Sequence, residues 1–559
     1  MYKQVLDPVS GSLGVSSIFA VLPLLVLFVL LGVFRMKAQW ASLASLLVAI
    51  LVAIFAYSMP VGQAADSAAE GAVFGFWPIM WIVINALWIY NMTESTGHFD
   101  VLKRAFSTVS DDLRVQVVMI AFCFGALLEA LAGFGTPVAI CGIMLVGLGV
   151  KPLKAAAVAL VADTAPVAFG AVAIPIITLG QVTGLPVHNL GAMVGRQTPF
   201  LALLIPFVLV FMTDGRRGVR ETWPAALTAG VVFAFFQFVV SNYVNVQLTD
   251  IIAALASAAA LVALLRVWTP GGVGAPAGSA SAGGGRPAIA GGAVSDPALE
   301  RRHGARSSGS GSGLKRADLL LAFAPYIIIV LVLGVTSLHP VQAAFDKATS
   351  VFSWPGLHVL NAKGKAPTSE TFKWTWLTAA GTWLFVSGVL TALILRVRPM
   401  DALRCYWRTI VQIKWAILTV CTVLAIAYVM NLSGQTATLG TWAAGAGSFF
   451  AFLSPLIGWF GTAVTGSDTS TNSLFGALQV AAAHKSGLSP TLLAAANSSG
   501  GVLAKMISPQ NLAIGAAAVG LAGQEGDIFR KVVAWSVGLV LLMALLVLLQ
   551  SGLLSWMVP

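Results

Sequence analysis

The stretch Gly466–Asn472 reads GSDTSTN, seven consecutive non-apolar residues within a region that is otherwise apolar. Glycine and polar residues interrupt a membrane helix, and the backbone groups they free must face protein, water or a solute. Close helix packing through small residues is the alternative explanation. A polar run of this length favours a binding site.

The composition places this stretch in a membrane protein. Of the 559 residues, 58% are hydrophobic and 9% are charged, whereas soluble domains carry about 25% charged residues. Apolar segments of about 20 residues, long enough to cross a bilayer as a helix, recur along the chain. We therefore expect an all-α polytopic membrane protein with about 12–14 spans, which excludes most soluble enzymes.

The few charged residues indicate orientation in the lipid bilayer rather than a nucleic-acid partner. The chain carries 32 Lys and Arg against 21 Asp and Glu, a net charge of +11. The basic residues gather in short loops near 35–37, 103–114, 216–220, 396–414 and 530–531. Because basic loops mark the cytoplasmic side, we predict that these loops are cytoplasmic, that both termini are outside and that no nucleic acid binds.

A stretch rich in Gly, Ala and Ser, residues 269–317, divides the chain. Such a composition cannot bury a core and is typical of a flexible linker, placed on the cytoplasmic side by its basic residues. The first predicted half is 1–268, which includes two additional spans at 224–268. The second half is 318–559.

The two halves contain related segments. WIVINALWIYNMTESTG (81–97) and LTVCTVLAIAYVMNLSG (418–434) both read as apolar helices that end in an Asn, Met and Ser or Thr cluster before glycine. According to the basic loops, the first copy runs inward and the second outward. We therefore predict two inverted repeats.

Each half also contains a region that is too long for one span and is interrupted by glycine, proline and polar residues, 115–180 and 438–519. DTAPVAFGAVAIP (163–175) and NSSGGVLAKMISP (497–509) share the spacing from a polar residue to a proline, and GFGTP (133–137) corresponds to the polar run. Interrupted segments in inverted halves predict broken helices or re-entrant hairpins around the midplane site of a secondary transporter.

The ends of such half-helices suit an anionic solute, because a helix N-terminus offers free NH groups and partial positive charge. The candidate binding residues are therefore the small and polar ones at the breaks. Arg196 is added because guanidinium can hold a carboxylate through two hydrogen bonds, although snorkelling or a helix contact explains it equally well. The set is Gly133, Gly135, Thr136, Gly466, Ser467, Thr469, Ser470, Asn497, Ser498 and Arg196.

Four ionisable residues lie at membrane depth, where each is costly unless it has a partner or a function. They are Glu129, one turn before GFGTP, Asp163 and Asp468 in the broken regions, and Lys505. A carboxyl that is neutral when buried and charged when exposed can carry a proton, so we predict proton-coupling roles. An ion pair of Asp163 or Asp468 with Lys505 is the structural alternative.

Other chemistries lack their motifs. The sequence has no GxxxxGK[ST] phosphate loop, no His, Cys or carboxylate cluster with metal-ligand spacing, and four cysteines without a CxxC pattern. We expect no cofactor, no bound metal and no enzymatic activity.

Several longer motifs are distributed over the chain: EALAGFGTPVAI (129–140), TAPVAFGA (164–171), GQVTG (180–184), VGRQTPFL (194–201), ETWPA (221–225), VTGSDTSTN (464–472) and GGVLAKMISPQNLAI (500–514). Together they resemble the bacterial L-lactate permease family. The resemblance implies a proton-coupled importer of L-lactate, and in relatives of D-lactate and glycolate, in the bacterial inner membrane. Asp163 stands where the family often has asparagine.

We expect transport by alternating access. One small 2-hydroxycarboxylate would bind between the two hairpins, and Glu129 or Asp468 would carry one proton. Because lactate and one proton together carry no net charge, a pH gradient rather than the membrane potential should drive uptake. A sodium-coupled carrier of another small organic anion would use the same hairpins and is the alternative.

Overall fold

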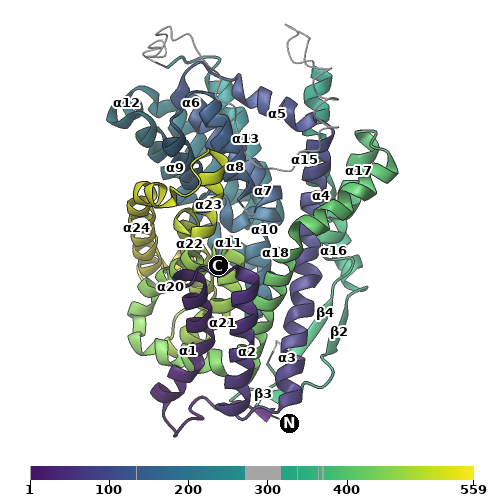
Figure 1. Ribbon diagram of the computed structural model, residues 1–559, viewed down its shortest axis with the longest axis vertical. Helices are drawn as coiled ribbons and strands as arrows, with labels where there is room; N and C mark the ends of the chain where they lie inside the picture. Colours follow the sequence, from purple (N-terminus) through teal and green to yellow (C-terminus); the bar gives the residue numbers. More distant parts are fainter. Residues whose placement is uncertain (1, 134, 271–315, 337, 363, 368–369) are drawn as a thin grey trace.

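The computed structural model describes residues 2–133, 135–270, 316–336, 338–362, 364–367 and 370–559. These residues form a predominantly helical fold, as expected (Figure 1). Within the described ranges, ten helices are long and apolar enough to cross a membrane, or up to eleven if one bent pair counts as a span. Most of the predicted linker, 269–317, lies outside the described residues.

Helices from both halves of the chain are interleaved in a frame, of which α3, α4, α15, α16 and α17 lie on the right in Figure 1. In this frame α18 packs against α2, α3 and α4, and α17 packs against α4 and α15. The frame comprises α1 (Leu13–Phe28), the π-helical η1 (Val29–Val33), α2 (Ala38–Phe55), α3 (Val61–Phe74), η2 (Gly75–Met80), α4 (Trp81–Ser95), α5 (His98–Ser107), α15 (Arg316–Thr336), α16 (His339–Asp346), α17 (Ala380–Ile394) and α18 (Pro399–Ser433).

A first core unit lies beside this frame. Its longest element, α12, leaves helical geometry at Asp214, Gly215 and Thr222. The two limbs on either side of these residues lie against each other, since the Thr198 hydroxyl donates to the Gln237 side chain at 3.1 Å, so they are two antiparallel segments that are counted as one helix. The unit comprises α6 (Leu113–Val117), η3 (Val118–Phe124), α7 (Gly125–Ala132), α8 (Thr136–Gly147), α9 (Pro152–Ala162), η4 (Val167–Phe169), α10 (Gly170–Thr183), α11 (Val187–Val194), α12 (Thr198–Tyr243), η5 (Val246–Leu248) and α13 (Thr249–Leu264).

A second core unit follows α18. Its helices α20, α21 and α22 pack against one another, and α21 also packs against α10 of the first unit. The unit comprises α19 (Gln435–Ala443), η7 (Ala444–Phe449), α20 (Phe450–Thr465), α21 (Asp468–Ser486), α22 (Pro490–Gly501), η8 (Val502–Ile507), α23 (Pro509–Ala518), α24 (Glu525–Gln550) and η9 (Ser555–Met557). The inverted relation of the two halves stays a prediction.

In the described part of the chain, four short strands accompany the helices, and the sequence pattern gave no signal for them. β1 (Tyr2–Lys3) pairs in parallel with β3 (Val359–Leu360), and β2 (Ser350–Ser353) pairs antiparallel with β4 (Thr371–Trp374). The Tyr2 hydroxyl donates to the carbonyl of Ser433 at 2.8 Å. The N-terminus is thereby attached to the end of α18.

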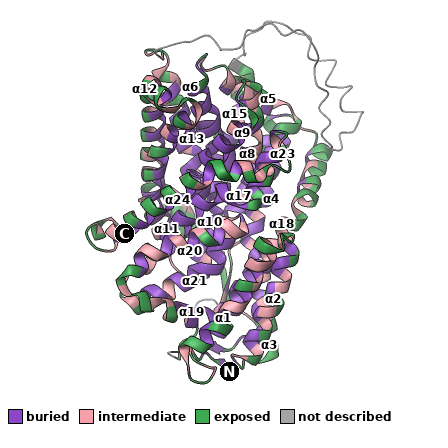
Figure 2. Cartoon of the chain, turned by 60° about the vertical axis from the view of Figure 1, so that its left-hand side comes forward, coloured by how far each residue is buried: buried purple, intermediate pink, exposed green. Residues whose placement is uncertain are grey.

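Burial is greatest in the centre of the molecule, where the two core units meet (Figure 2). Every residue from Arg114 to Ala132 is buried, whereas only a third of the apolar window in Leu13–Val33 is. Lipid-facing spans keep one side exposed, so Leu113–Ala132 belongs to the protein interior. Its end at Ala132 leads directly to the GFGTP break.

Candidate functional site

Two helical hairpins reach the centre with their tips. In the first, α7 ends at Ala132 and α8 begins at Thr136 after Gly135, whose φ of +83° suits glycine. In the second, α20 ends at Thr465, Gly466 has a φ of +75°, and the Ser467 hydroxyl caps α21. The polar run therefore breaks the helix as predicted and exposes the N-terminus of α21.

Two broken helices complete the centre. α9 and the η4–α10 segment are bent by 61° at a break of no more than four residues, so Asp163 lies at the start of an interruption. Beyond it, Ala171, Val172 and Ala173 all have positive φ, a conformation that non-glycine residues rarely adopt and that is concentrated at functional sites.

The second interruption lies between α22 and α23. α22 ends at Gly501, η8 continues to Ile507, and the Ser508 hydroxyl accepts a hydrogen bond from the amide of Asn511 at 3.4 Å. Pro509 occupies the first position of α23, where a missing NH costs nothing. The pair Ser508–Pro509 thus starts a half-helix at the site.

Three of the predicted ionisable residues meet at these interruptions. The ammonium of Lys505 lies 2.7 Å from Oε1 of Glu129 and 2.9 Å from Oδ2 of Asp163. All three residues are at least 95% buried. Lys505 comes from η8, Glu129 from α7 and Asp163 from the end of α9, so the cluster joins both core units.

The charges of this cluster do not balance. Two carboxylates and one ammonium leave one net negative charge, which a buried, weakly polar site disfavours. Oε2 of Glu129 and Oδ1 of Asp163 also have no hydrogen-bond partner in the described structure. One bound proton makes the cluster neutral, so the site has the composition of a proton carrier.

Asp468 lies apart from the ion-pair cluster and is held differently. Its Oδ2 accepts a hydrogen bond from the Ser498 hydroxyl at 2.5 Å and another from the Asn472 amide at 3.3 Å. Asn497 donates to Asn472 at 2.9 Å, which extends the network along α22. The predicted pairing of Lys505 is thus realised with Asp163 and not with Asp468.

A cavity of about 60 Å³ lies between the hairpin tips and the two interruptions. Since about 10–15 Å³ on this scale holds one water molecule, the cavity has room for a few waters or a small solute. Its polar wall faces an apolar wall from the α10 region. The lining residues are Glu129, Gly133, Val167, Gly170, Ala171, Ile174, Pro175, Gly466, Ser467, Asp468, Thr469, Lys505, Gln510 and Asn511.

Half of this lining coincides with residues predicted from the sequence. The predicted residues that line the cavity are Glu129, Gly133, Gly466, Ser467, Asp468, Thr469 and Lys505. Gln510 and Asn511 were missed, although a polar pair directly after a Ser-Pro helix start was an available signal. Val167, Ala171 and Ile174 were missed because nothing in an apolar stretch marks which residues face a cavity.

The other predicted residues support the site from outside the cavity. Asn497 and Ser498 bind Asn472 and Asp468, and the Ser470 amide bonds to the Ser467 cap. A Cβ added to Gly135 would lie 2.6 Å from Ile514, so this glycine permits close packing onto α23. Thr136 begins α8 and does not line the cavity.

Arg196 is placed elsewhere. Its guanidinium donates to Oδ1 of Asn242 at 2.9 Å and to the carbonyl of Met557 at 2.8 Å. These bonds tie the start of α12 to its end and to the C-terminal segment, and Arg196 lines a separate recess. The helix-contact explanation therefore fits Arg196 better than binding of a carboxylate at the centre.

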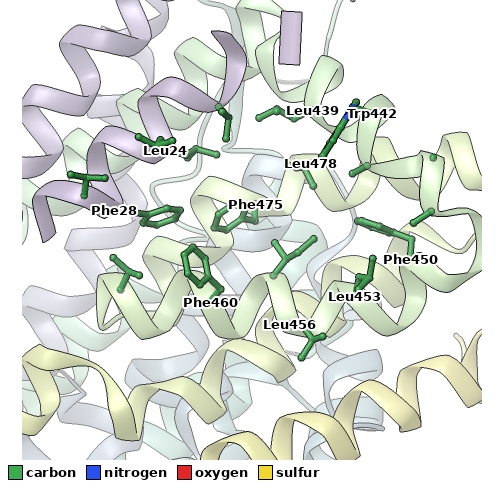
Figure 3. A pocket seen from close by; sticks show the side chains of 18 of the residues that line it. Leu24, Phe28, Leu439, Trp442, Phe450, Leu453, Leu456, Phe460, Phe475 and Leu478 are labelled. Atoms are coloured by element: carbon green, nitrogen blue, oxygen red, sulfur yellow. The ribbon is translucent and has the colours of Figure 1, made fainter. Parts of the chain in front are cut away.

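A larger hollow of about 1100 Å³ lies between α1, α19, α20 and α21 (Figure 3). Its labelled side chains, which include Leu24, Phe28, Phe460 and Phe475, are almost all apolar (Figure 3). Because a carboxylate without hydrogen-bond donors is strongly disfavoured, this hollow does not suit an organic anion. The small central cavity is the candidate site.

Comparison with known proteins identifies the family. The profile of the L-lactate permease family matches residues 16–554. The chain belongs to the L-lactate permease family. Within it, the chain is 41% identical to glycolate permease GlcA of Escherichia coli K12, covering 97% of this chain and 96% of that protein. It is 39% identical to L-lactate permease of Bacillus subtilis 168, with both chains fully covered.

Membership in the L-lactate permease family makes the chain a multi-pass protein of the bacterial inner membrane and a permease for a small organic anion, not an enzyme. Among solved structures, the YdaH transporter of Alcanivorax borkumensis matches with a TM-score of 0.46 and 14% identity, covering 87% of this chain and 88% of that chain.

Proposed function

We propose that this permease imports L-lactate, and also D-lactate and glycolate, together with one proton by alternating access. The names of its relatives support the substrate class, since glycolate and L-lactate are both small 2-hydroxycarboxylates. The observation that carries the proton coupling is the buried cluster of Glu129, Asp163 and Lys505, which is neutral only with one bound proton.

The cavity offers matching groups for such a substrate. The N-terminus of α21 presents the backbone NH groups of Asp468 and Thr469, which suit the carboxylate, beside the side chains of Ser467 and Thr469. Their hydroxyls, with the amide side chains of Gln510 and Asn511, suit the substrate hydroxyl. The apolar wall formed by Ala171 and Ile174 suits the methyl group of lactate.

The proton and the substrate occupy adjoining positions in this proposal. Glu129 and Lys505 line the cavity directly, so a bound anion would lie beside the ammonium. A substrate carboxylate would add a second negative charge next to the cluster, and a proton on Glu129 would offset it. Binding of one therefore favours binding of the other, which is the requirement for symport.

Counterflow in proteoliposomes tests the substrate. Vesicles loaded with unlabelled L-lactate should take up external labelled L-lactate, and internal D-lactate or glycolate should replace it as the exchange partner. Propionate, which lacks the hydroxyl, is the matched control and should exchange at least about tenfold more slowly, since about 1.4 kcal/mol of lost hydrogen bonding gives that factor. Equal exchange with propionate, or exchange only in sodium, would refute the proposal.

A further inference from the structure

Another buried carboxyl, Asp250, lies outside the central cavity. It is in the first turn of α13 and is fully buried. Its Oδ1 accepts a hydrogen bond from the Gln237 amide at 3.3 Å, and its Oδ2 has no hydrogen-bond partner in the described structure. A carboxylate with one long hydrogen bond and no counter-ion is unfavourable at this depth, whereas the protonated acid is tolerated.

Gln237 connects Asp250 to the first broken helix. The same amide nitrogen donates to the carbonyl of Ala165 at 3.2 Å, two residues after Asp163 of the ion-pair cluster. The Gln237 oxygen accepts a hydrogen bond from the Thr198 hydroxyl at 3.1 Å. Gln237 thus holds Asp250 and the interruption at Asp163 in one network.

A second branch reaches the other broken helix. Gln197, adjacent to Thr198, accepts a hydrogen bond from the Ser499 hydroxyl at 2.7 Å. The neighbouring Ser498 is the residue that binds Asp468. The network that ends at Asp250 therefore contacts both interruptions, although Asp250 itself does not line the cavity.

Few ionisable side chains on the elements packed against α13 could exchange a proton with Asp250. α13 packs against α7, α10, α12, α15, η3 and η5. Among the described ionisable side chains on these elements, Glu129 on α7 is the one that belongs to the ion-pair cluster, whereas α12 carries Asp214, Arg216, Arg217, Arg220 and Glu221 in its loop and Tyr243 at its end. Cys123 on η3 is bonded to Ser257, α10 and η5 contain no ionisable residue, and α15 contributes Asp318 and Tyr326 among its described side chains.

The far end of α13 shows on which side Asp250 lies. Trp268, just beyond α13, lines a recess together with Arg216 and Arg220 of the basic loop in α12. This loop is predicted to be cytoplasmic, so Asp250, at the opposite end of a helix of 16 residues, lies toward the outer side. Asp250 is therefore situated between the outer surface and the ion-pair cluster.

We propose that Asp250 is an outer proton-binding carboxyl of this permease, which accepts a proton from the outer side and supplies it to the Glu129–Asp163–Lys505 cluster. In each cycle the proton leaves the Asp250 acid and binds the Glu129 carboxylate. Asp250 becomes a carboxylate and is protonated again from outside water. The inference rests on the proposed proton symport.

The experiment compares wild-type protein with Asp250→Asn in proteoliposomes. Asparagine keeps the shape and can still accept from Gln237, but it cannot hold an exchangeable proton. We expect accumulation of labelled L-lactate driven by a pH gradient to slow at least about tenfold, while counterflow at equal pH stays within about twofold of wild type. Thr249→Val, an adjacent buried change without an ionisable group, should behave as wild type in both assays.

A second variant keeps the test decisive if Asp250→Asn does not fold. Gln237→Leu leaves Asp250 in place but removes its link to Ala165, and it should show the same selective loss of pH-driven accumulation. Wild-type rates of accumulation in a folded Asp250→Asn or Gln237→Leu protein overturn the inference alone. Absence of pH-driven accumulation in the wild-type protein would instead overturn the proposed symport.

Discussion

The ammonium of Lys505 lies 2.7 Å from Oε1 of Glu129, a residue 376 positions earlier in the chain. This buried contact joins the interruption after α22 to the tip of the first hairpin. Asp163 adds a second carboxyl to the same ammonium at 2.9 Å. The centre of the molecule is therefore held by charges that one proton balances.

Removal of the ammonium should destabilise the fold. Lys505→Met leaves Glu129 and Asp163 buried without a counter-ion, and breaking a buried ion pair from one side costs about 3–5 kcal/mol. We expect a lower thermal unfolding midpoint in detergent and loss of lactate uptake. The double variant Lys505→Met with Asp163→Asn removes one uncompensated carboxylate and should recover part of the midpoint. A midpoint equal to wild type in the single variant would contradict the central role of this cluster.

Glutamine at position 129 should separate exchange from accumulation. Glu129→Gln keeps the size of the side chain and an acceptor for Lys505, but it cannot carry a proton. We expect counterflow of labelled L-lactate to persist while accumulation driven by a pH gradient is abolished. Accumulation equal to wild type would remove Glu129 from the carrier role.

The packing of the second hairpin on α22 depends on two glycines. A Cβ on Gly458 would lie 1.9 Å from the carbonyl oxygen of Asn497, and one on Gly500 would lie 2.1 Å from that of Pro455. Gly458→Ala and Gly500→Ala should each destabilise the protein by about 1–3 kcal/mol, the usual cost of overpacking. Gly538→Ala in α24 is the control, because no atom lies within 4 Å of the added Cβ. Equal unfolding midpoints for all three variants would contradict this packing.

The breaks were predictable because their signal is local. Glycine, proline and consecutive polar residues cannot continue a lipid-facing helix, so GFGTP and GSDTSTN located both hairpin tips. The apolar residues around Glu129, Asp163 and Lys505 also predicted that these side chains lie at membrane depth. Their spacing in the sequence suggested a pairing with Lys505 but did not distinguish Asp163 from Asp468.

Features that depend on tertiary packing could not be read in this way. For Arg196 the sequence left a carboxylate ligand, snorkelling and a helix contact open, and only the fold brings Asn242 and the Met557 carbonyl to its guanidinium. Ala171 and Ile174 line the cavity beside a stretch of backbone, Ala171 to Ala173, that has positive φ. An apolar pattern alone does not specify which side chains face a cavity and which face another helix.

An ion-pair network outside the membrane core gives a pH-dependent contribution to stability. Burial would raise the pKa of Asp112, but hydrogen bonds from the side chain and amide of Arg114 hold it below its ordinary value. Arg114 also binds Asp214 at 3.1 Å and Glu221 at 2.5 Å, which joins the start of α6 to the loop in α12. The carboxylate of Asp112 therefore stabilises the folded state.

The lowered pKa of Asp112 determines how the stability of the folded protein changes with pH. Because the folded pKa of Asp112 is lowered, its contribution is complete above the ordinary pKa of about 3.9 and is lost as the pH falls through the lower, folded value. Asp112→Asn should reduce stability at pH 7 by about 1 kcal/mol, because a neutral amide replaces the charged acceptor of the Arg114 guanidinium while asparagine still caps α6, and the difference should shrink in acid. Unfolding midpoints between pH 7 and pH 3 check this, and a difference that is constant over that range would contradict it.

The coupling of one lactate to one proton is tested most directly by uptake of labelled L-lactate into proteoliposomes under imposed gradients. An acidic exterior at zero potential should drive accumulation, because the lactate anion and one proton together carry no charge across the membrane. An imposed potential at equal pH should drive none. Accumulation that follows the potential at equal pH, or that requires sodium, would contradict the account.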